Sequence, residues 1–130
     1  MAASEDNIAI PPIILDWSPW TPWAVLVKDA RTHPGARVPN KRPGVYEARR
    51  READERLTIG KAKDLRHRVK QGLIRGEAPH PSGAAIRAKE DLARVEVRWA
   101  ITERPAAVEE ELHQRHRVRH GRLPLYTRHT

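Results

Sequence analysis

Residues 43–69, PGVYEARRREADERLTIGKAKDLRHRV, decide the fold of this chain. The Pro-Gly pair is a turn signal, and the β-prone run Gly44-Val45-Tyr46 follows it. A charged loop at residues 49–56 leads to a second run, Leu57-Thr58-Ile59-Gly60. Because helix-forming residues come directly after Gly60, the stretch predicts a strand, a connection, a second strand and then a helix.

The predicted helix begins at Lys61. Seven residues make nearly two turns at 3.6 residues per turn, and this spacing puts Lys61 and Arg68 on one side of the helix. Both cations are therefore expected to face one ligand. The neighbouring side of the helix is apolar and consists of Ala62, Leu65, Val69 and Leu73.

Three more elements are predicted after this stretch. Ser82 is a plausible N-cap for a helix that runs through Arg94. Residues 95–101 alternate between apolar and polar side chains, apart from Ala100, and this is typical of a half-buried strand. A last helix is expected from Pro105 to about His120, with Gly121 as its C-terminal cap. The order of elements predicts an α+β domain with a three-stranded sheet and flanking helices.

Residues 1–41 form a predicted N-terminal extension that is rich in Trp and Pro. Residues 1–7 are expected to be disordered, and residues 8–15 are expected to be extended because two prolines interrupt them. Trp17, Trp20 and Trp23 then recur at every third position. They either cover the core, stack on unpaired bases or bind a protein partner. We favour the first interpretation, since the chain contains no Phe and its core needs large side chains.

The composition narrows the functional classes. A net charge of +8 and a pI near 10.6 favour a polyanionic partner, nucleic acid before membrane. The chain has no cysteine, and this excludes disulfides, iron–sulfur clusters and thiolate zinc sites. No signal peptide is evident, and no segment reaches the roughly 20 apolar residues that a transmembrane helix needs. A cytoplasmic location, with no membrane partner, is expected.

The central stretch resembles the GIY-YIG endonuclease family. Gly44-Val45-Tyr46 stands at the family's Gly-Ile-Tyr, and Thr58-Ile59-Gly60 stands at its Tyr-Ile-Gly. Arg68 follows Gly60 at the spacing of the family's helix arginine. The resemblance covers about residues 42–127, within a predicted nuclease domain of residues 42–130, and implies an antiparallel three-stranded sheet with flanking helices. The chain departs from the family pattern at Thr58, where a tyrosine is usual, and at Thr127, where an asparagine is usual.

The resemblance also implies an active site. Tyr46 would act as a base or proton relay for the attacking water, and Arg68 and Lys61 would bind the phosphate. Gly60 would let the backbone turn tightly and approach the substrate, and Thr58 would supply a hydroxyl. Glu109, three residues before Leu112, matches the family's metal-binding glutamate and would hold Mg²⁺ or Mn²⁺. A free tyrosine has a pKa near 10, so nearby cations are needed for Tyr46 to act as a base near neutral pH.

Histidines offer a different metal site. His113, His116 and His120 follow Glu109 on one helical stripe, and two histidines with a glutamate are a known zinc ligand set. The alternative is a solvated or phosphate-contacting basic face. His67 and His80 are also within reach of the predicted site, although no spacing requires either of them.

These patterns lead to three hypotheses. The first is a metal-dependent endonuclease that cleaves DNA. The second is a non-catalytic nucleic-acid-binding module on the same scaffold, which Thr58 and Thr127 favour. The third is an interaction domain stabilised by zinc at the histidine stripe. None of the sequence patterns specifies the DNA target or the oligomeric state.

Overall fold

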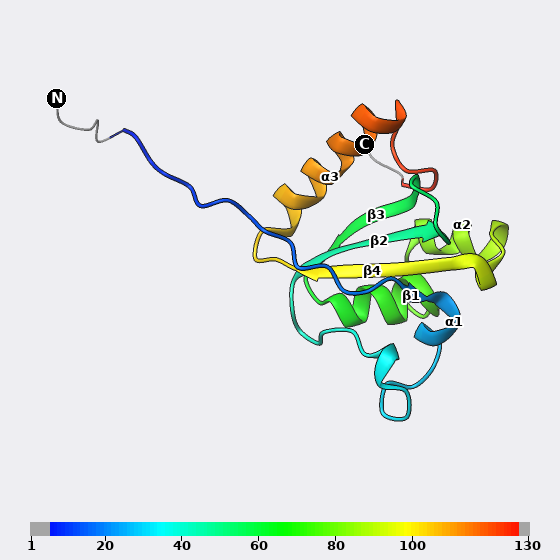
Figure 1. Cartoon of the computed structure of the whole chain (residues 1–130). Helices are drawn as coiled ribbons and strands as arrows, with labels where there is room; N and C mark the ends of the chain where they lie inside the picture. The colour runs from blue at the N-terminus through cyan, green and yellow to red at the C-terminus, as the bar shows by residue number, and fades with distance from the viewer. Residues whose placement is uncertain (1–5, 128–130) are drawn as a thin grey trace.

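The computed structural model describes residues 6–127, and these contain one antiparallel sheet in the strand order β1-β4-β2-β3 (Figure 1). The strands are β1 (Thr21–Pro22), β2 (Gly44–Arg50), β3 (Arg56–Ala62) and β4 (Val95–Ile101). The prediction of an α+β fold is confirmed, but the predicted number of strands is one too small. The missed strand, β1, has two residues that pair with Val97 and Glu96, and so short a segment shows no alternation.

Six helical segments surround the sheet in the described part of the chain. They are α1 (Trp23–Leu26), η1 (Pro34–Ala36), η2 (His67–Ile74), α2 (Pro81–Lys89), η3 (Leu92–Arg94) and α3 (Pro105–His120). The prediction for α3 is confirmed at both ends, since Pro105 opens the helix and Gly121 closes it with a left-handed φ of 76°. None of these helices is long and apolar enough to cross a bilayer.

The helix after Gly60 begins later than predicted. Lys61 and Ala62 belong to β3, where they pair with Val45 and Gly44 of β2. Helical backbone begins only at Leu65 and continues as η2, which is a π-helix. The local sequence favours a helix at Lys61, but pairing with the neighbouring strand prevails. The prediction that Lys61 and Arg68 share one helical stripe is therefore wrong.

Two other predicted boundaries need correction. The charged loop is shorter than predicted, because Arg49 and Arg50 extend β2 and Arg56 begins β3. The helix predicted from Ser82 to Arg94 divides into α2 and η3, with a break at Glu90. Its N-cap is His80, whose side chain accepts a hydrogen bond from the backbone N–H of Gly83. The predicted cap residue instead donates its hydroxyl to the backbone oxygen of Tyr126.

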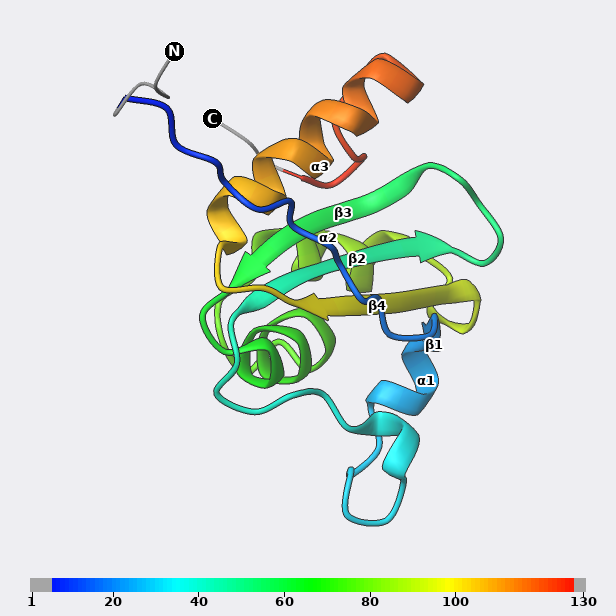
Figure 2. The ribbon, with the colours of Figure 1, turned by 60° about the vertical axis from the view of Figure 1, so that its left-hand side comes forward.

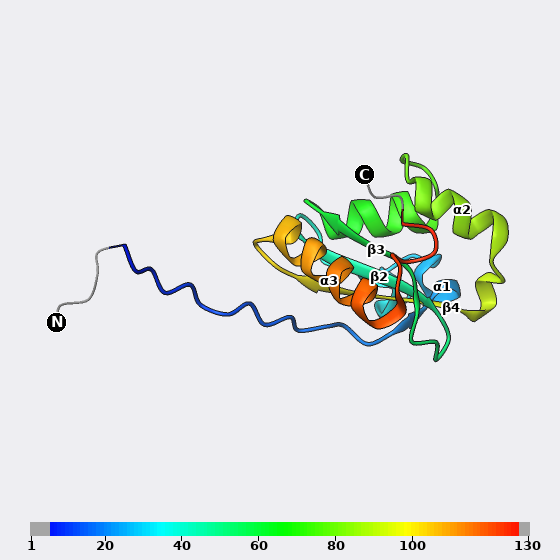
Figure 3. The ribbon, with the colours of Figure 1, turned by 90° about the horizontal axis from the view of Figure 1, so that it is seen from above.

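Helical elements cover both faces of the sheet. Figure 3, a view from above, shows α3 on one side of the strands and α2 on the other, and Figure 2 shows α3 running beside β3. The larger core lies on the α2 side and includes Tyr46, Leu65, Val69, Leu73 and Ile86. The smaller core lies under α3, where Val45 and Ala100 contact Val108. Because side chains alternate along a strand, Val45 and Tyr46 of β2 face different cores.

The N-terminal segment runs from outside the domain into its core. Ile8, Ile10 and Ile14 are exposed on an extended segment that projects from the domain (Figure 1), whereas Trp23 is buried in the larger core. The disorder predicted for residues 1–7 lies mostly outside the described residues. The core role that we favoured for the tryptophans is thus confirmed at Trp23.

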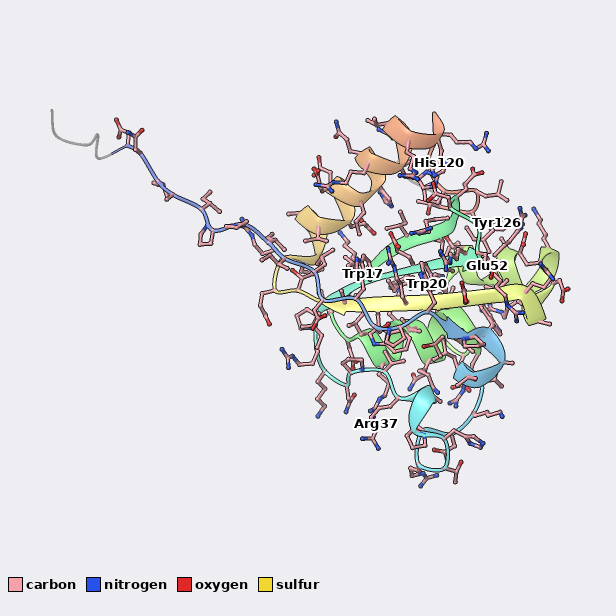
Figure 4. The ribbon with its side chains drawn as sticks, in the orientation of Figure 1. Trp17, Trp20, Arg37, Glu52, His120 and Tyr126 are labelled. Carbon is pink, nitrogen blue, oxygen red and sulfur yellow. The ribbon has the colours of Figure 1, made fainter. Side chains whose placement is uncertain are left out.

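The other two tryptophans lie over arginines of the sheet (Figure 4). Trp20 stacks on Arg49, with 4.0 Å from guanidinium carbon to ring centroid, and Trp17 stacks on Arg98 at 4.1 Å. The carboxylate of Glu47, which is buried below them, bonds Arg98 at 2.8 Å. These rings are engaged within the protein and cover the sheet face. A protein partner for this segment stays a prediction.

Candidate active site

A cavity of about 370 Å³ lies at the edge of β3, which is the outer strand of the sheet. Within residues 6–127 no strand continues the sheet beyond β3, so side chains from both faces of β3 reach this cavity. All six residues predicted for the site line it, namely Tyr46, Thr58, Gly60, Lys61, Arg68 and Glu109. The cavity is completed by Ile59, His80, Ser82, His113 and Thr127. Residues from β2, β3, η2, α2 and α3 are thus brought together.

The phenol of Tyr46 lies directly above Gly60. Both residues occupy paired positions on adjacent strands and face the same side of the sheet. A Cβ atom on Gly60 would lie 2.3 Å from the hydroxyl oxygen of Tyr46 and 2.4 Å from its ring carbon Cζ. The glycine is therefore required for the close packing of the phenol. Gly60 lies within β3, so the prediction of a tight backbone turn at this residue is wrong.

The hydroxyl of Tyr46 bonds the side chain of His80. Its Oη lies 2.7 Å from Nε2, and the other ring nitrogen, Nδ1, accepts the N–H of Gly83 at 3.0 Å. A neutral imidazole carries one proton, and Nδ1 is an acceptor here, so the proton lies on Nε2. His80 therefore donates to Tyr46, and the hydroxyl proton of Tyr46 is left to point elsewhere.

Burial governs the protonation of both residues. It raises the pKa of Tyr46 to about 12, against the opposing effect of the Arg68 charge, and the negative charge of Glu109 adds to the increase. Burial likewise lowers the pKa of His80 to about 4, with the charges of Arg68 and Arg87 acting in the same direction. At neutral pH Tyr46 is a phenol and His80 is a neutral imidazole. Nearby cations thus do not bring the pKa of Tyr46 toward neutrality in the free protein.

Two cations reach the cavity from different elements. Arg68 extends from η2, and its Nη1 donates a hydrogen bond of 3.0 Å to the backbone oxygen of Pro79. Lys61 extends from β3 and is exposed. Neither has a carboxylate partner within residues 6–127. The guanidinium of Arg68 also lies within hydrogen-bonding reach of the Tyr46 hydroxyl. Since no carboxylate engages Arg68, its remaining N–H groups are available to an anion.

The two threonines at which the chain departs from the family pattern contact one another. The Oγ1 atoms of Thr58 and Thr127 lie 3.1 Å apart, and Thr127 also accepts the backbone N–H of Ile59 at 3.2 Å. Thr58 is buried, so its hydroxyl serves this contact at the wall of the cavity. The C-terminal segment is thereby joined to the edge of β3.

Glu109 is the carboxylate of this cavity. It is half-buried on α3, and its side chain has no hydrogen bond or ion pair within the described residues. Mg²⁺ is usually held by one or two carboxylates and keeps several of its waters. One unengaged carboxylate at the wall of a roomy cavity fits this preference. Glu109 would hold the ion, with water as the remaining ligands.

The histidine stripe does not form a zinc site. Both ring nitrogens of His116 are engaged, since Nδ1 donates to the backbone oxygen of Arg122 and Nε2 accepts the N–H of Arg56. His113 bonds the backbone oxygen of Ile59 through Nε2, and His120 contacts Asp54. Within residues 6–127 no group of three or more His, Asp or Glu side chains is arranged to hold a metal ion.

His80 lines the site, although no spacing in the sequence requires it there. Its position between Pro79 and Pro81, directly before α2, is a signal for an N-cap, but histidine is not among the usual capping residues. The contact with Tyr46 spans 34 positions of sequence, and no local pattern reveals it. His67, the other histidine considered, is exposed and does not line the cavity.

Comparison of the chain with protein-family models, with curated proteins and with solved structures finds no match.

Proposed function

We propose that this protein is a metal-dependent endonuclease that hydrolyses phosphodiester bonds in DNA. The observation that carries the proposal is the convergence of a buried tyrosine hydroxyl, two cations and an unengaged carboxylate on one cavity. Phosphodiester hydrolysis requires an activated water, cations for the phosphate and a charge that stabilises the leaving oxygen. The basic charge of the chain and the resemblance of residues 44–68 to the GIY-YIG motifs support the same function.

Tyr46 acts as a proton relay in this proposal. With a pKa of about 12, only about 1 in 30,000 molecules carries the phenolate at pH 7.5, so a free base is too rare. As the water oxygen bonds phosphorus, its proton passes to Oη and the hydroxyl proton of Tyr46 passes to a phosphoryl oxygen. The bond between phosphorus and the leaving oxygen breaks, and the leaving oxygen takes the electron pair of that bond. The Nε2–H of His80 orients Oη throughout and remains on the imidazole.

Arg68 and Lys61 bind the phosphate. The planar guanidinium of Arg68 engages two phosphoryl oxygens, and Lys61 contributes a point charge from β3. A divalent ion held by Glu109 would supply charge stabilisation at the leaving oxygen. The family resemblance suggests Mg²⁺ or Mn²⁺ for this position.

A non-catalytic nucleic-acid-binding module is the second candidate function. The raised pKa of Tyr46 favours it, since a phenol that binds without reacting needs no accessible phenolate. The contact between Thr58 and Thr127 favours it as well, because both hydroxyls are used within the protein.

Nicking of supercoiled DNA separates the two candidates. Purified protein is incubated with plasmid in Mg²⁺, Mn²⁺ or EDTA, and nicked circles are expected with either metal and not with EDTA. Glu109→Gln should abolish nicking and retain DNA binding. Glu111→Gln is the matched control, because Glu111 lies on the same helix outside the cavity and pairs with Arg115. Salt-sensitive binding without nicking in either metal would favour the binding module.

A further inference from the structure

A second cavity, of about 410 Å³, adjoins the candidate active site. The two cavities share Lys61, Glu109 and His113 as lining residues, so they are two halves of one depression around the edge of β3. The second half adds three polar residues of α3, which are Glu110, Gln114 and Arg117. None of these three has a role in the proposed chemistry.

Arg117 differs from the other arginines in this part of the chain. Arg115 pairs with Glu111 at 3.0 Å, Arg119 pairs with Asp54, and Arg122 pairs with Glu55 at 2.6 Å. The guanidinium of Arg117 has no hydrogen bond or ion pair within residues 6–127. An unengaged guanidinium at the wall of a cavity is a donor set for an anion.

Other hydrogen-bond donors line the second cavity beside Arg117. Gln114 precedes Arg117 by three residues, so their side chains emerge from one face of α3. Lys61 lines the same cavity from β3. Glu110 also lines the cavity and is exposed, as Lys61 and Arg117 are, so water screens all three charges alike. The cavity thus offers two cations and an amide against one solvated carboxylate, with Glu109 assigned to the metal.

We propose that this second cavity binds the backbone phosphate that adjoins the cleaved one, through Arg117 and Gln114, with Lys61 on the wall that both cavities share. This inference rests on the proposed function, because it requires the scissile phosphate to lie beside Tyr46 and Arg68. Consecutive phosphates of a duplex strand follow one another at about 3.4 Å of helix axis, so a second phosphate necessarily lies close to the first. The shared wall at Lys61 and Glu109 gives the strand a continuous path across α3.

A site for a second phosphate implies that the substrate is a polynucleotide. A polynucleotide strand fills both cavities, whereas a single phosphodiester with no neighbouring phosphate fills only the first. Arg117 therefore contributes to the binding of a polynucleotide and not to the chemical step. Its removal raises KM for an oligonucleotide and leaves kcat nearly unchanged.

The first test compares Arg117→Ala with Arg115→Ala. Both residues are exposed on α3 two positions apart, but Arg115 lies outside both halves of the depression. Arg117→Ala should weaken oligonucleotide binding, measured by fluorescence anisotropy with Ca²⁺ in place of Mg²⁺, by about 10- to 100-fold. Arg115→Ala should have a much smaller effect. Equal losses of binding in the two variants would overturn the inference.

The second test removes the negative charge of one substrate phosphate at a time. Oligonucleotides with one methylphosphonate each, at successive positions beside the cleaved bond, are bound to wild-type protein and to Arg117→Ala. At one position next to the cleaved bond the neutral group should weaken binding to wild type and have no further effect on the variant. Additive losses at every position would contradict the second phosphate site. If the wild-type protein binds but does not cleave, the proposed function fails, while the comparison of Arg117→Ala with Arg115→Ala, which needs no cleavage, still decides the second site.

Discussion

The hydroxyl oxygens of Thr58 and Thr127 lie 3.1 Å apart at the wall of the cavity that contains Tyr46. Thr127 also accepts the N–H of Ile59, and Tyr126 donates its backbone N–H to Leu57. The C-terminal segment therefore follows the outer edge of β3 and satisfies part of its backbone. In this way the two departures from the family pattern form one structural unit.

We expect Thr127→Val to destabilise the fold by about 1–2 kcal/mol, because the N–H of Ile59 and the hydroxyl of Thr58 lose their partner. Thr127→Ser keeps the hydroxyl and should retain most of the stability. Urea unfolding followed by tryptophan fluorescence measures both variants. Equal stability of the valine and serine variants would show that the hydroxyl contributes little.

The packing of Tyr46 against Gly60 gives a second prediction. In Gly60→Ala the new Cβ atom overlaps the phenol at 2.3 Å, so the ring must move away from the cavity. We expect a loss of about 1–3 kcal/mol in stability, together with loss of DNA cleavage. Gly35→Ala is the control, because its Cβ atom would meet Val25 at an ordinary 3.6 Å. Cleavage at the wild-type rate by Gly60→Ala would mean that the position of the phenol is unimportant.

His80 should make stability depend on pH. Its pKa is about 4 in the folded protein and about 6.5 in the unfolded chain, so below pH 6.5 the unfolded chain binds the proton first. The stability that His80 provides is complete above pH 6.5 and decreases as the pH falls toward 4, by up to about 3 kcal/mol.

The measurement compares wild type with His80→Asn, since asparagine keeps the N-cap acceptor but cannot titrate. The difference in unfolding free energy between the two proteins should decrease from pH 7 to pH 4. His116, whose pKa burial also lowers, is present in both proteins, so its contribution cancels. A difference that stays constant over this range would contradict the buried, neutral state of His80.

The raised pKa of Tyr46 can be measured directly. The chain has two tyrosines, so Tyr126→Phe leaves Tyr46 alone. Ultraviolet titration of this variant should show half-ionisation near pH 12, or no ionisation before alkaline unfolding. Since the unfolded chain releases this proton near pH 10, stability should fall as the pH rises from 10 to 12. Ionisation at or below pH 10 in the folded variant would remove the reason for a relay and favour a simple base.

Much of the fold follows from local sequence signals. The alternation at residues 95–101 predicts β4 at both ends, and Pro105 with Gly121 predicts α3 equally well. The predictions fail where pairing with a strand distant in sequence determines the secondary structure. Lys61 belongs to β3 because it pairs with Val45 of β2. The two residues of β1 form a strand because they pair with the edge of β4.

In the candidate site, too, some features follow from local sequence and others depend on contacts between distant segments. Six residues named from sequence line one cavity, because the motif positions lie close together on paired strands and on the helices beside them. Neither the bond between Tyr46 and His80 nor the direction in which burial shifts the pKa of Tyr46 follows from sequence. Both arise from contacts between segments far apart in the chain, which no spacing rule describes.

The central claim is that the hydroxyl of Tyr46 transfers a proton during DNA cleavage. Tyr46→Phe removes this one oxygen, and Tyr126→Phe is the matched control, because its hydroxyl bonds Glu90 outside the cavity. Single-turnover cleavage is measured in saturating Mg²⁺, with folding and DNA binding verified for each variant. We predict a loss of about 100-fold or more for Tyr46→Phe and a rate close to wild type for Tyr126→Phe. Cleavage by folded Tyr46→Phe at the wild-type rate would contradict the account.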